Sequence, residues 1–315
     1  MSLVTHDKET GRAASGLGLA LVSASSFGLS GPLGRGLMDA GWTSAAAVAV
    51  RVLLAALVLL PVAVVRLRGR THLLRRNAPL VAGYGLVAVA ACQLSFFNAV
   101  ARMEVGVALL VEYTAPIAVV GWLWLRHGRR PGRLTVLGAA FGVVGLLLVL
   151  DLLSGAEVDV VGVLWALGAM VGAAVYFVLS GRQDDALPGS ALAAGGLLLG
   201  GLVLVAAGLV GLVPFEATTA PVRFAGVTGD GVTVAWWLPV LGLGVVTAAL
   251  GYVTGIAATR RLGSRLASFV ALTEVLMSLV FAWVLLGEAV RPGQLAGGAL
   301  TLLGVVVVRL GEPRT

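Results

Sequence analysis

Long apolar runs alternate with short basic stretches along almost the whole chain. A run of about 20 apolar residues is long enough for a helix to cross the hydrocarbon core of a membrane. These runs lack the apolar–polar alternation of barrel strands, and backbone in lipid must satisfy its own hydrogen bonds, so each run is expected to be a helix. The pattern predicts an all-α integral membrane protein with ten transmembrane helices, at 16–37, 44–65, 79–100, 104–126, 133–151, 160–181, 190–213, 235–259, 264–286 and 293–310.

Composition supports this class. The 315 residues are 59% hydrophobic and only 12% charged, whereas soluble domains are about 25% charged. Residues 1–15 are polar and are expected to form a cytoplasmic N-terminal tail that is followed by a retained first span. The net charge of +7 comes mainly from arginines between the spans, which indicates cytoplasmic anchors in a cell membrane rather than a nucleic-acid site.

The distribution of Lys and Arg predicts the orientation. Of these residues, 17 fall on the side that holds the N-terminus and the 66–78 connection, and four fall on the other side. Basic residues accumulate on the cytoplasmic side of membrane proteins, so both termini are predicted to be cytoplasmic. The connection 214–234 then lies outside the cell, and its Gly, Pro and Thr content predicts a loop.

Two halves of the chain resemble each other. Arg130-Pro131-Gly132 and Arg291-Pro292-Gly293 occupy equivalent junctions between spans, and the shift of 161 residues that aligns them places Tyr113 opposite Glu274. Five helices per half is an odd number, so the second half must enter the membrane from the opposite face. We therefore predict an inverted repeat with halves 16–151 and 160–310, an architecture typical of secondary transporters with a central site near the membrane midplane.

The span at 104–126 contains the most informative polar residue. Glu112 lies near its middle, where a charge costs several kcal/mol unless it is paired or hydrated. Pro116 follows four residues later and cannot donate to the Glu112 carbonyl, so a helix break is expected there. If Glu112 is a functional residue, it is expected to face a polar cavity. The alternative is a protonated, hydrogen-bonded glutamic acid that only packs against its neighbours.

Glu274 occupies the corresponding span of the second half, with Ser278 one turn later on the same helical face. Desolvation favours the neutral form of a carboxylic acid, which can then exchange a proton near neutral pH. Glu112 and Glu274 are therefore candidates for substrate binding or proton coupling. A glutamic acid that satisfies polar backbone in a packed interface is the alternative.

Further polar groups lie at membrane depth. Arg51 is expected either to bind a substrate carboxylate or to extend outward and pair with Asp39. Ser95, Asn98 and Tyr113 are additional candidates for substrate binding, although each alone is more typical of a helix–helix hydrogen bond.

Gly28 and Pro32 predict a flexible break in the first span, because Pro32 cannot donate to the Gly28 carbonyl. The same stretch, Gly28-Leu29-Ser30-Gly31, matches the G-x-S-G pattern of intramembrane serine proteases. A serine nucleophile needs a base within reach, and no histidine lies inside a span. The break is therefore expected to serve gating, and the protein is not expected to be an enzyme.

Several other classes of site are not expected. Cys92 is the single cysteine, the three histidines lie at or outside the span ends, and no phosphate-binding loop of the ATPase type appears. We expect no metal site and no cofactor. Glycines spaced four residues apart, such as Gly138 and Gly142, predict close helix packing, while both a monomer and a homodimer stay open.

The whole chain resembles the EamA-type transporters of the drug/metabolite transporter superfamily. The resemblance is carried by Arg51, by the run ALLVEYTAPIAV around Glu112 and by the pattern LLGE-x5-Q that ends in Glu288 and Gln294. The glutamate in VEYTAP is similar to that of the threonine/homoserine exporter branch, and His127-Gly128 departs from the family's pattern. The resemblance implies export of amino acids or related small metabolites, in some members driven by the proton gradient.

Together these observations predict a secondary transporter whose partners are a small metabolite, a proton and membrane lipid. An amino acid would place its ammonium at Glu112 and Glu274 and its carboxylate at Arg51 or a free helix end. A multidrug exporter of lipophilic cations is the first alternative, with Arg51 then structural. A non-transporting membrane scaffold or sensor is the alternative from another class.

Overall fold

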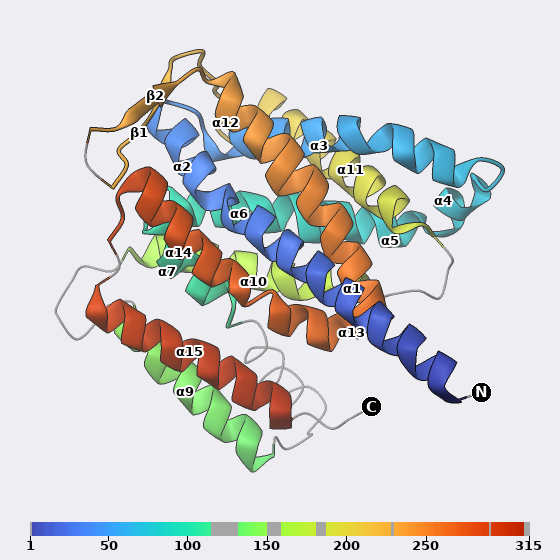
Figure 1. Ribbon diagram of the computed structural model, residues 1–315. Helices are drawn as coiled ribbons and strands as arrows, with labels where there is room; N and C mark the ends of the chain where they lie inside the picture. Colours follow the sequence, from blue (N-terminus) through green and yellow to red (C-terminus); the bar gives the residue numbers. More distant parts are fainter. Residues whose placement is uncertain are drawn as a thin grey trace.

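The computed structural model describes residues 2–114, 132–149, 159–180, 187–227, 230–289 and 291–311. Helices dominate this part of the chain, and the only strands described form one short hairpin (Figure 1). The first half contains α1 (Ser2–Gly28), α2 (Ser30–Asp39), α3 (Ser44–Leu67), α4 (His72–Arg76), α5 (Ala78–Gly83), η1 (Tyr84–Ala91), α6 (Cys92–Val100), α7 (Val105–Glu112) and α9 (Arg133–Val149). The second contains α10 (Val160–Ser180), α11 (Gly189–Leu209), β1 (Val222–Phe224), β2 (Val232–Val234), α12 (Trp237–Leu241), η3 (Gly242–Leu250), α13 (Gly251–Val270), α14 (Thr273–Leu286) and α15 (Pro292–Gly311).

The helices have the length and polarity of membrane spans. Within the described residues, six helical stretches are long and apolar enough to cross a bilayer, and shorter apolar helices lie at Arg133–Gly145 and Thr273–Leu286. Many large apolar side chains face outward; Leu57 is 65% exposed and Leu164 is 62% exposed. In a protein surrounded by hydrocarbon these side chains face lipid at no cost. The chain is a multi-pass membrane protein.

Packing relates the two halves of the chain. Helix α3 of the first half packs against α11 of the second half. Helix α3 also packs against η3, and α11 correspondingly packs against η1. In the same way α1 packs along α13, and α10 packs along α6 (Figure 1). Each of these contacts has a counterpart in which the roles of the halves are exchanged. Such reciprocal pairing is what an internal two-fold relation between the halves would produce.

Three of the predicted spans are broken rather than continuous. The first is interrupted at Leu29, between α1 and α2, and helix begins already at Ser2, inside the predicted tail 1–15. In the fourth, α7 ends at Glu112 and a turn follows at Tyr113, so the predicted span 104–126 is interrupted close to the break expected from Pro116. The absence of an N–H at Pro116 gives the physical reason, because the Glu112 carbonyl loses its helical donor. Pro116 itself lies outside the described residues.

The predicted ninth span contains a break that the sequence did not indicate. Helix α13 is kinked at Gly263, whose φ of 80° and ψ of 156° are non-helical, and this kink falls in the predicted connection between the eighth and ninth spans. A second interruption follows at Ala271 and Leu272, inside the predicted ninth span, and α14 begins at Thr273. Glu274 therefore lies in the first turn of a helix instead of the middle of one.

Widened π-helical turns occupy corresponding places in the two halves. Segment η1 follows α5 and leads into α6, and segment η3 follows α12 and leads into α13. Each is preceded by a proline, Pro79 and Pro239, in the short helix before it. Such turns are rare in proteins, and those that occur often lie at functional sites. Both lead directly into residues that line the central cavity described below.

One end of the molecule is covered by the 214–234 connection. Its hairpin pairs Val222 with Val234 and packs Phe224 against Gly36 of α2. The indole Nε1 of Trp42 donates to the Thr218 carbonyl at 2.8 Å. The prediction of a loop at 214–234 was therefore incomplete, because this connection contains a hairpin that packs on α2.

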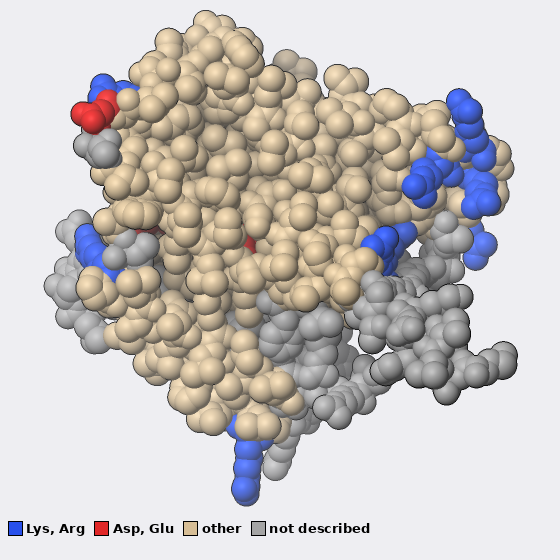
Figure 2. All heavy atoms as spheres, viewed as in Figure 1, with Lys and Arg blue, Asp and Glu red and all other residues tan. Residues whose placement is uncertain are grey.

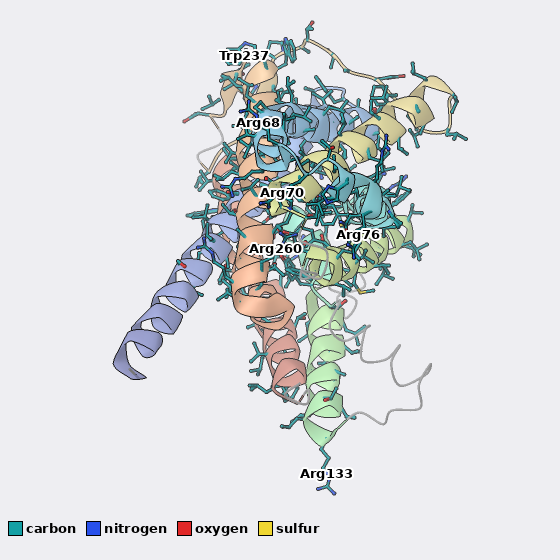
Figure 3. The ribbon with its side chains drawn as sticks, turned by 90° about the vertical axis from the view of Figure 1, so that its right-hand side faces the viewer. Arg68, Arg70, Arg76, Arg133, Trp237 and Arg260 are labelled. Atoms are coloured by element: carbon teal, nitrogen blue, oxygen red, sulfur yellow. The ribbon has the colours of Figure 1, made fainter. Side chains whose placement is uncertain are left out.

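The opposite end carries most of the basic side chains that are visible. Figure 2 shows a face covered largely by uncharged side chains, with its largest group of Lys and Arg at the end where α4 lies. Figure 3, viewed toward that end, shows Arg68, Arg70 and Arg76 beyond α3 together with Arg260 on α13. The hairpin and the start of α1 lie at opposite ends of the molecule (Figure 1). The two ends thus differ strongly in charge.

Helices α9 and α15 form a close pair at the edge of the molecule (Figure 1). A Cβ added at Gly304 would lie 2.5 Å from both the Gly138 carbonyl oxygen and the Gly142 nitrogen. Backbone atoms cannot move aside as a flexible side chain can. The two helices therefore depend on small residues for their separation.

We predict that Gly304→Ala lowers the free energy of unfolding by about 1–3 kcal/mol, the usual cost of overpacking. Gly18→Ala is the matched control, because nothing lies within 4 Å of an added Cβ there. Thermal unfolding of the purified protein in detergent compares the two variants. Equal unfolding midpoints for both variants would contradict the described contact between α9 and α15.

Candidate functional site

A cavity lies where the broken helices meet. Its free volume is about 70 Å³, counted as the space open to the centre of a water molecule. A cavity of about 10–15 Å³ already holds one water, so this cavity has room for several. The walls come from α1, the η1–α6 and η3–α13 helices, α7 with the turn after it, α10 and α14. The polar and aromatic lining residues are Ser23, Phe27, Cys92, Gln93, Glu112, Tyr113, Tyr176, Phe177, Tyr252, Thr259 and Glu274.

Both predicted glutamates line this cavity. Glu112 is the last residue of α7, and Glu274 is in the first turn of α14. The Tyr113 hydroxyl donates to the Glu274 Oε2 at 2.7 Å. The 161-residue shift aligns Tyr113 with Glu274. Residues related by a two-fold axis contact each other only where they lie close to that axis, so this contact would mark the position of the axis between the two halves.

Arg51 is buried behind the cavity wall. Only 1% of the residue is exposed, and it is absent from the residues that line the cavity. Its guanidinium donates to Gln93 and lies 5.6 Å from the centre of the Phe97 ring, a cation–π distance. The alternative in which Arg51 pairs with Asp39 is wrong, because Asp39 instead accepts from Arg35 at 3.1 Å.

Gln93 connects Arg51 to the cavity. Its Nε2 donates to the Tyr252 hydroxyl at 3.2 Å, and both residues line the cavity. Next to it, the Cys92 Sγ lies 4.0 Å from the Glu112 Oε1. The cavity wall at the start of α6 thus carries an amide, a thiol and a phenol close to the two carboxylates.

Aromatic rings complete the wall. Phe27 meets Tyr252 edge to face with 5.1 Å between ring centres, and Tyr176 lies 5.8 Å from Tyr252. Three of the four tyrosines in the chain line the cavity, and the fourth, Tyr84, packs 5.9 Å from Tyr176. Aromatic faces attract cations, so this wall suits an ammonium group.

The other predicted site residues lie elsewhere. Ser95 is buried against Gly168 of α10. Asn98 donates to its own helix at Leu94 and lines a separate pocket beside Trp42. The structure therefore does not bring Ser95 and Asn98 to the cavity.

Of the predicted gating residues, Gly28 and Pro32 do not line the cavity, and Pro116 lies outside the described residues. A Cβ on Gly28 would lie 3.0 Å from the Ser278 nitrogen and 3.1 Å from the Glu274 carbonyl oxygen, so glycine permits this close approach of α1 to α14. Ser278 is fully buried in that contact, and Pro32 is buried in α2. Gly28 thus supports the helix turn that carries Glu274.

Two further residues hold α7 in place. The Glu288 Oε2 accepts from the backbone N–H of Val105, the first residue of α7, at 3.2 Å. Gln294 donates to Glu104 at 2.7 Å. Glu288 and Gln294 thereby fix the start of the helix whose last residue is Glu112.

Comparison with known proteins agrees with this architecture. The sequence profile of the EamA-like transporter family matches residues 14–151 and again residues 160–310. The chain belongs to the EamA-like transporter family. It is a transporter of the drug/metabolite transporter superfamily and not an enzyme.

Two curated relatives of this EamA protein carry the name threonine/homoserine exporter RhtA. The protein from Escherichia coli strain K12 is 29% identical over 225 residues, and the one from Salmonella typhimurium strain SL1344 is 28% identical over 225 residues. The alignment covers 70% of this chain and 66%, just under two thirds, of each relative. One solved crystal structure shares the fold, with a TM-score of 0.61 at 21% identity, over 93% of this chain and 96% of its own.

Sequence reasoning missed several residues of the cavity. Gln93 of α6 lines the cavity, whereas the predicted candidates Ser95 and Asn98 of the same helix do not. Cys92, Tyr176, Tyr252 and Phe27 are ordinary residues of apolar helices by sequence. Their location next to the two π-helical segments is a signal that the sequence does not display.

The arrangement suits binding of a small polar molecule. Within the described residues, no group of three or more His, Cys, Asp or Glu side chains could hold a metal ion. The cavity instead offers two carboxyl groups and aromatic faces to a cation, and amide and phenol donors to an anion.

We predict that the Tyr113–Glu274 hydrogen bond couples the two halves energetically. A double-mutant cycle with Tyr113→Phe and Glu274→Gln should give an interaction free energy of about 0.5–3 kcal/mol, as is usual for residues in direct contact. Thermal unfolding in detergent measures all four proteins. Strict additivity of the two single changes would show that this contact does not stabilise the protein.

Proposed function

We propose that this EamA transporter exports small zwitterionic metabolites, most specifically neutral amino acids, across the cytoplasmic membrane. The observation that carries the proposal is the pairing of Glu112 and Glu274 in one small cavity beside hydrogen-bond donors. The names of the curated relatives support an amino acid as substrate and export as direction. The substrate's ammonium would bind between the carboxyl groups and the aromatic wall.

The size of the cavity separates the candidate substrates. The free volume of the cavity is about 70 Å³, so only a small solute fits. Pockets for drug-sized ligands measure roughly 300–1,000 Å³. The cavity volume therefore favours an amino acid over the lipophilic cations of a multidrug exporter, although its acids and aromatic rings would suit either ammonium group.

The proposal includes the architecture predicted from sequence: ten spans, an inverted repeat with halves 16–151 and 160–310, and cytoplasmic termini. Reciprocal helix pairing and the matching π-helical segments support the repeat. Arg68, Arg70, Arg76 and Arg260 at one end support the orientation (Figure 3).

The cavity is proposed to face the cytoplasm in this structure. Its lining extends along α13 through Ala258 and Thr259, next to the basic pair Arg260-Arg261. On the hairpin side, the close contacts of Gly28 with α14 and of Phe224 with Gly36 leave little space. Alternating access would open these contacts and separate the elements at the basic end.

Proton antiport completes the proposal. A proton and a substrate ammonium would compete for the same carboxylates, so protonation from outside would release the substrate and deprotonation inside would readmit it. This exchange requires no further cofactor. A non-transporting scaffold or sensor would have no need of two acids in a cavity.

The test is flux from proteoliposomes loaded with labelled threonine and homoserine, with and without a pH gradient. Wild-type protein should release amino acid faster when the outside is more acidic, because protons then enter as the amino acid leaves. Glu112→Gln should slow release about tenfold or more, since a hydrogen bond to a charged group contributes about 1.5–3 kcal/mol. Glu216→Gln is the matched control, because this carboxylate is exposed in the 214–234 connection.

Unchanged flux and unchanged pH dependence in Glu112→Gln would contradict the proposal. Absence of amino acid flux in wild type, together with protection of cells against cationic dyes, would support the multidrug alternative. Absence of flux for both classes of substrate would support the scaffold.

A further inference from the structure

Gln93 occupies a distinctive place in the cavity wall, because among the described residues it alone both bonds to the buried guanidinium and lines the cavity. Arg51 donates to the Gln93 Oε1, and Gln93 in turn donates to the Tyr252 hydroxyl at 3.2 Å. The chain of groups therefore runs from a fixed positive charge to the cavity surface through one amide.

The chemistry of the partners fixes the orientation of the amide. A guanidinium group carries only donors, so it must face the oxygen of Gln93 and not its nitrogen. The Gln93 NH₂ group is thereby turned toward the cavity. Ordinary ambiguity between the oxygen and nitrogen of an amide does not arise here.

Donors remain available at this wall. The NH₂ group has two hydrogens, and within the described residues one is donated to Tyr252. Tyr252 accepts that bond, so its own O–H is left to donate. Two donors of the same wall can therefore reach one acceptor in the cavity.

The buried charge strengthens these donors. Arg51 is 1% exposed, and its Nε and Nη2 have no hydrogen-bond partner within the described part of the chain. A positive charge in a low-dielectric interior acts over a longer distance than it would in water, and hydrogen bonds in series polarise one another. Gln93 thus presents an N–H that is biased toward an anionic acceptor.

We infer that Gln93, with Tyr252 beside it, is the subsite for the substrate's carboxylate, and that Arg51 acts as a positioning residue behind it. This inference rests on the proposed function and adds its anionic half. It also revises the expectation that Arg51 contacts the substrate directly. The site would take molecules that carry a carboxylate and an ammonium a few bonds apart.

The test is competitive binding of labelled threonine to the purified protein, with 1-amino-2-propanol as competitor. This competitor is threonine without its carboxylate, so the ratio of the two affinities isolates the anionic subsite. Wild type should prefer threonine about 10- to 150-fold, the equivalent of a charge-assisted hydrogen bond. Gln93→Leu should reduce the preference to within about threefold of equality.

Gln93→Glu replaces the donor amide with a negatively charged carboxylate in a side chain of the same shape. The new carboxylate would repel that of threonine, so threonine binding should be lost while 1-amino-2-propanol still binds. Arg51→Met should lower the preference although its side chain lies outside the cavity. Asn98→Leu is the matched control, since this amide in the same helix donates only to Leu94 in the described structure and should leave the ratio unchanged.

The outcomes separate the two proposals. Wild-type binding of threonine with an unaltered preference in Gln93→Leu and Gln93→Glu overturns the subsite and leaves the proposed function standing. Absence of threonine binding in wild type overturns both. A Gln93→Glu protein that loses both ligands, with an unfolding midpoint equal to that of wild type, also contradicts a subsite that contacts only the carboxylate.

Discussion

Enclosure of three ionisable groups among apolar helices is the constraint on which the rest of this structure depends. Arg51 is buried, and Glu112 and Glu274 line an internal cavity; inside a membrane protein an isolated charge costs several kcal/mol. Arg51 meets this cost with Gln93 and the Phe97 ring, and Glu274 with the Tyr113 hydroxyl. A cavity large enough for several waters or one small solute supplies the remaining solvation.

The helix breaks follow from the same constraint. Glu112 ends α7, and Glu274 lies in the first turn of α14, so each acid stands at an interruption of its span. The N–H and C=O groups at helix ends have no partner within the helix and need other polar groups, whereas those inside a continuous helix bond to each other. The structure therefore concentrates polar backbone, carboxyl groups and hydrated space in one place and leaves the outer surfaces to lipid.

Sequence patterns predicted the apolar spans, the repeat and the two acids, because hydropathy and isolated charges are properties of single segments. They also predicted a break near Gly28 and one after Glu112, since proline removes a donor wherever it stands. The location of the second-half break at Ala271–Leu272 was missed, because no proline marks it. The composition of the cavity wall was missed for a different reason: the face of a helix that meets a cavity depends on how the helix is rotated against its neighbours, so Gln93 and Tyr252 could not be distinguished from Asn98 and Ser95.

The central claim is that the cavity between the two halves is the substrate site. Cys92 is the only cysteine in the chain, and it lines this cavity 4.0 Å from Glu112. The decisive measurement is therefore the rate at which a small thiosulfonate reagent converts Cys92 into a mixed disulfide, with release of sulfinate, in purified protein with and without threonine. The account predicts that threonine slows labelling in a saturable manner and that Glu112→Gln removes this protection. Labelling that proceeds at the same rate in the presence of saturating threonine would place the substrate elsewhere and contradict the account.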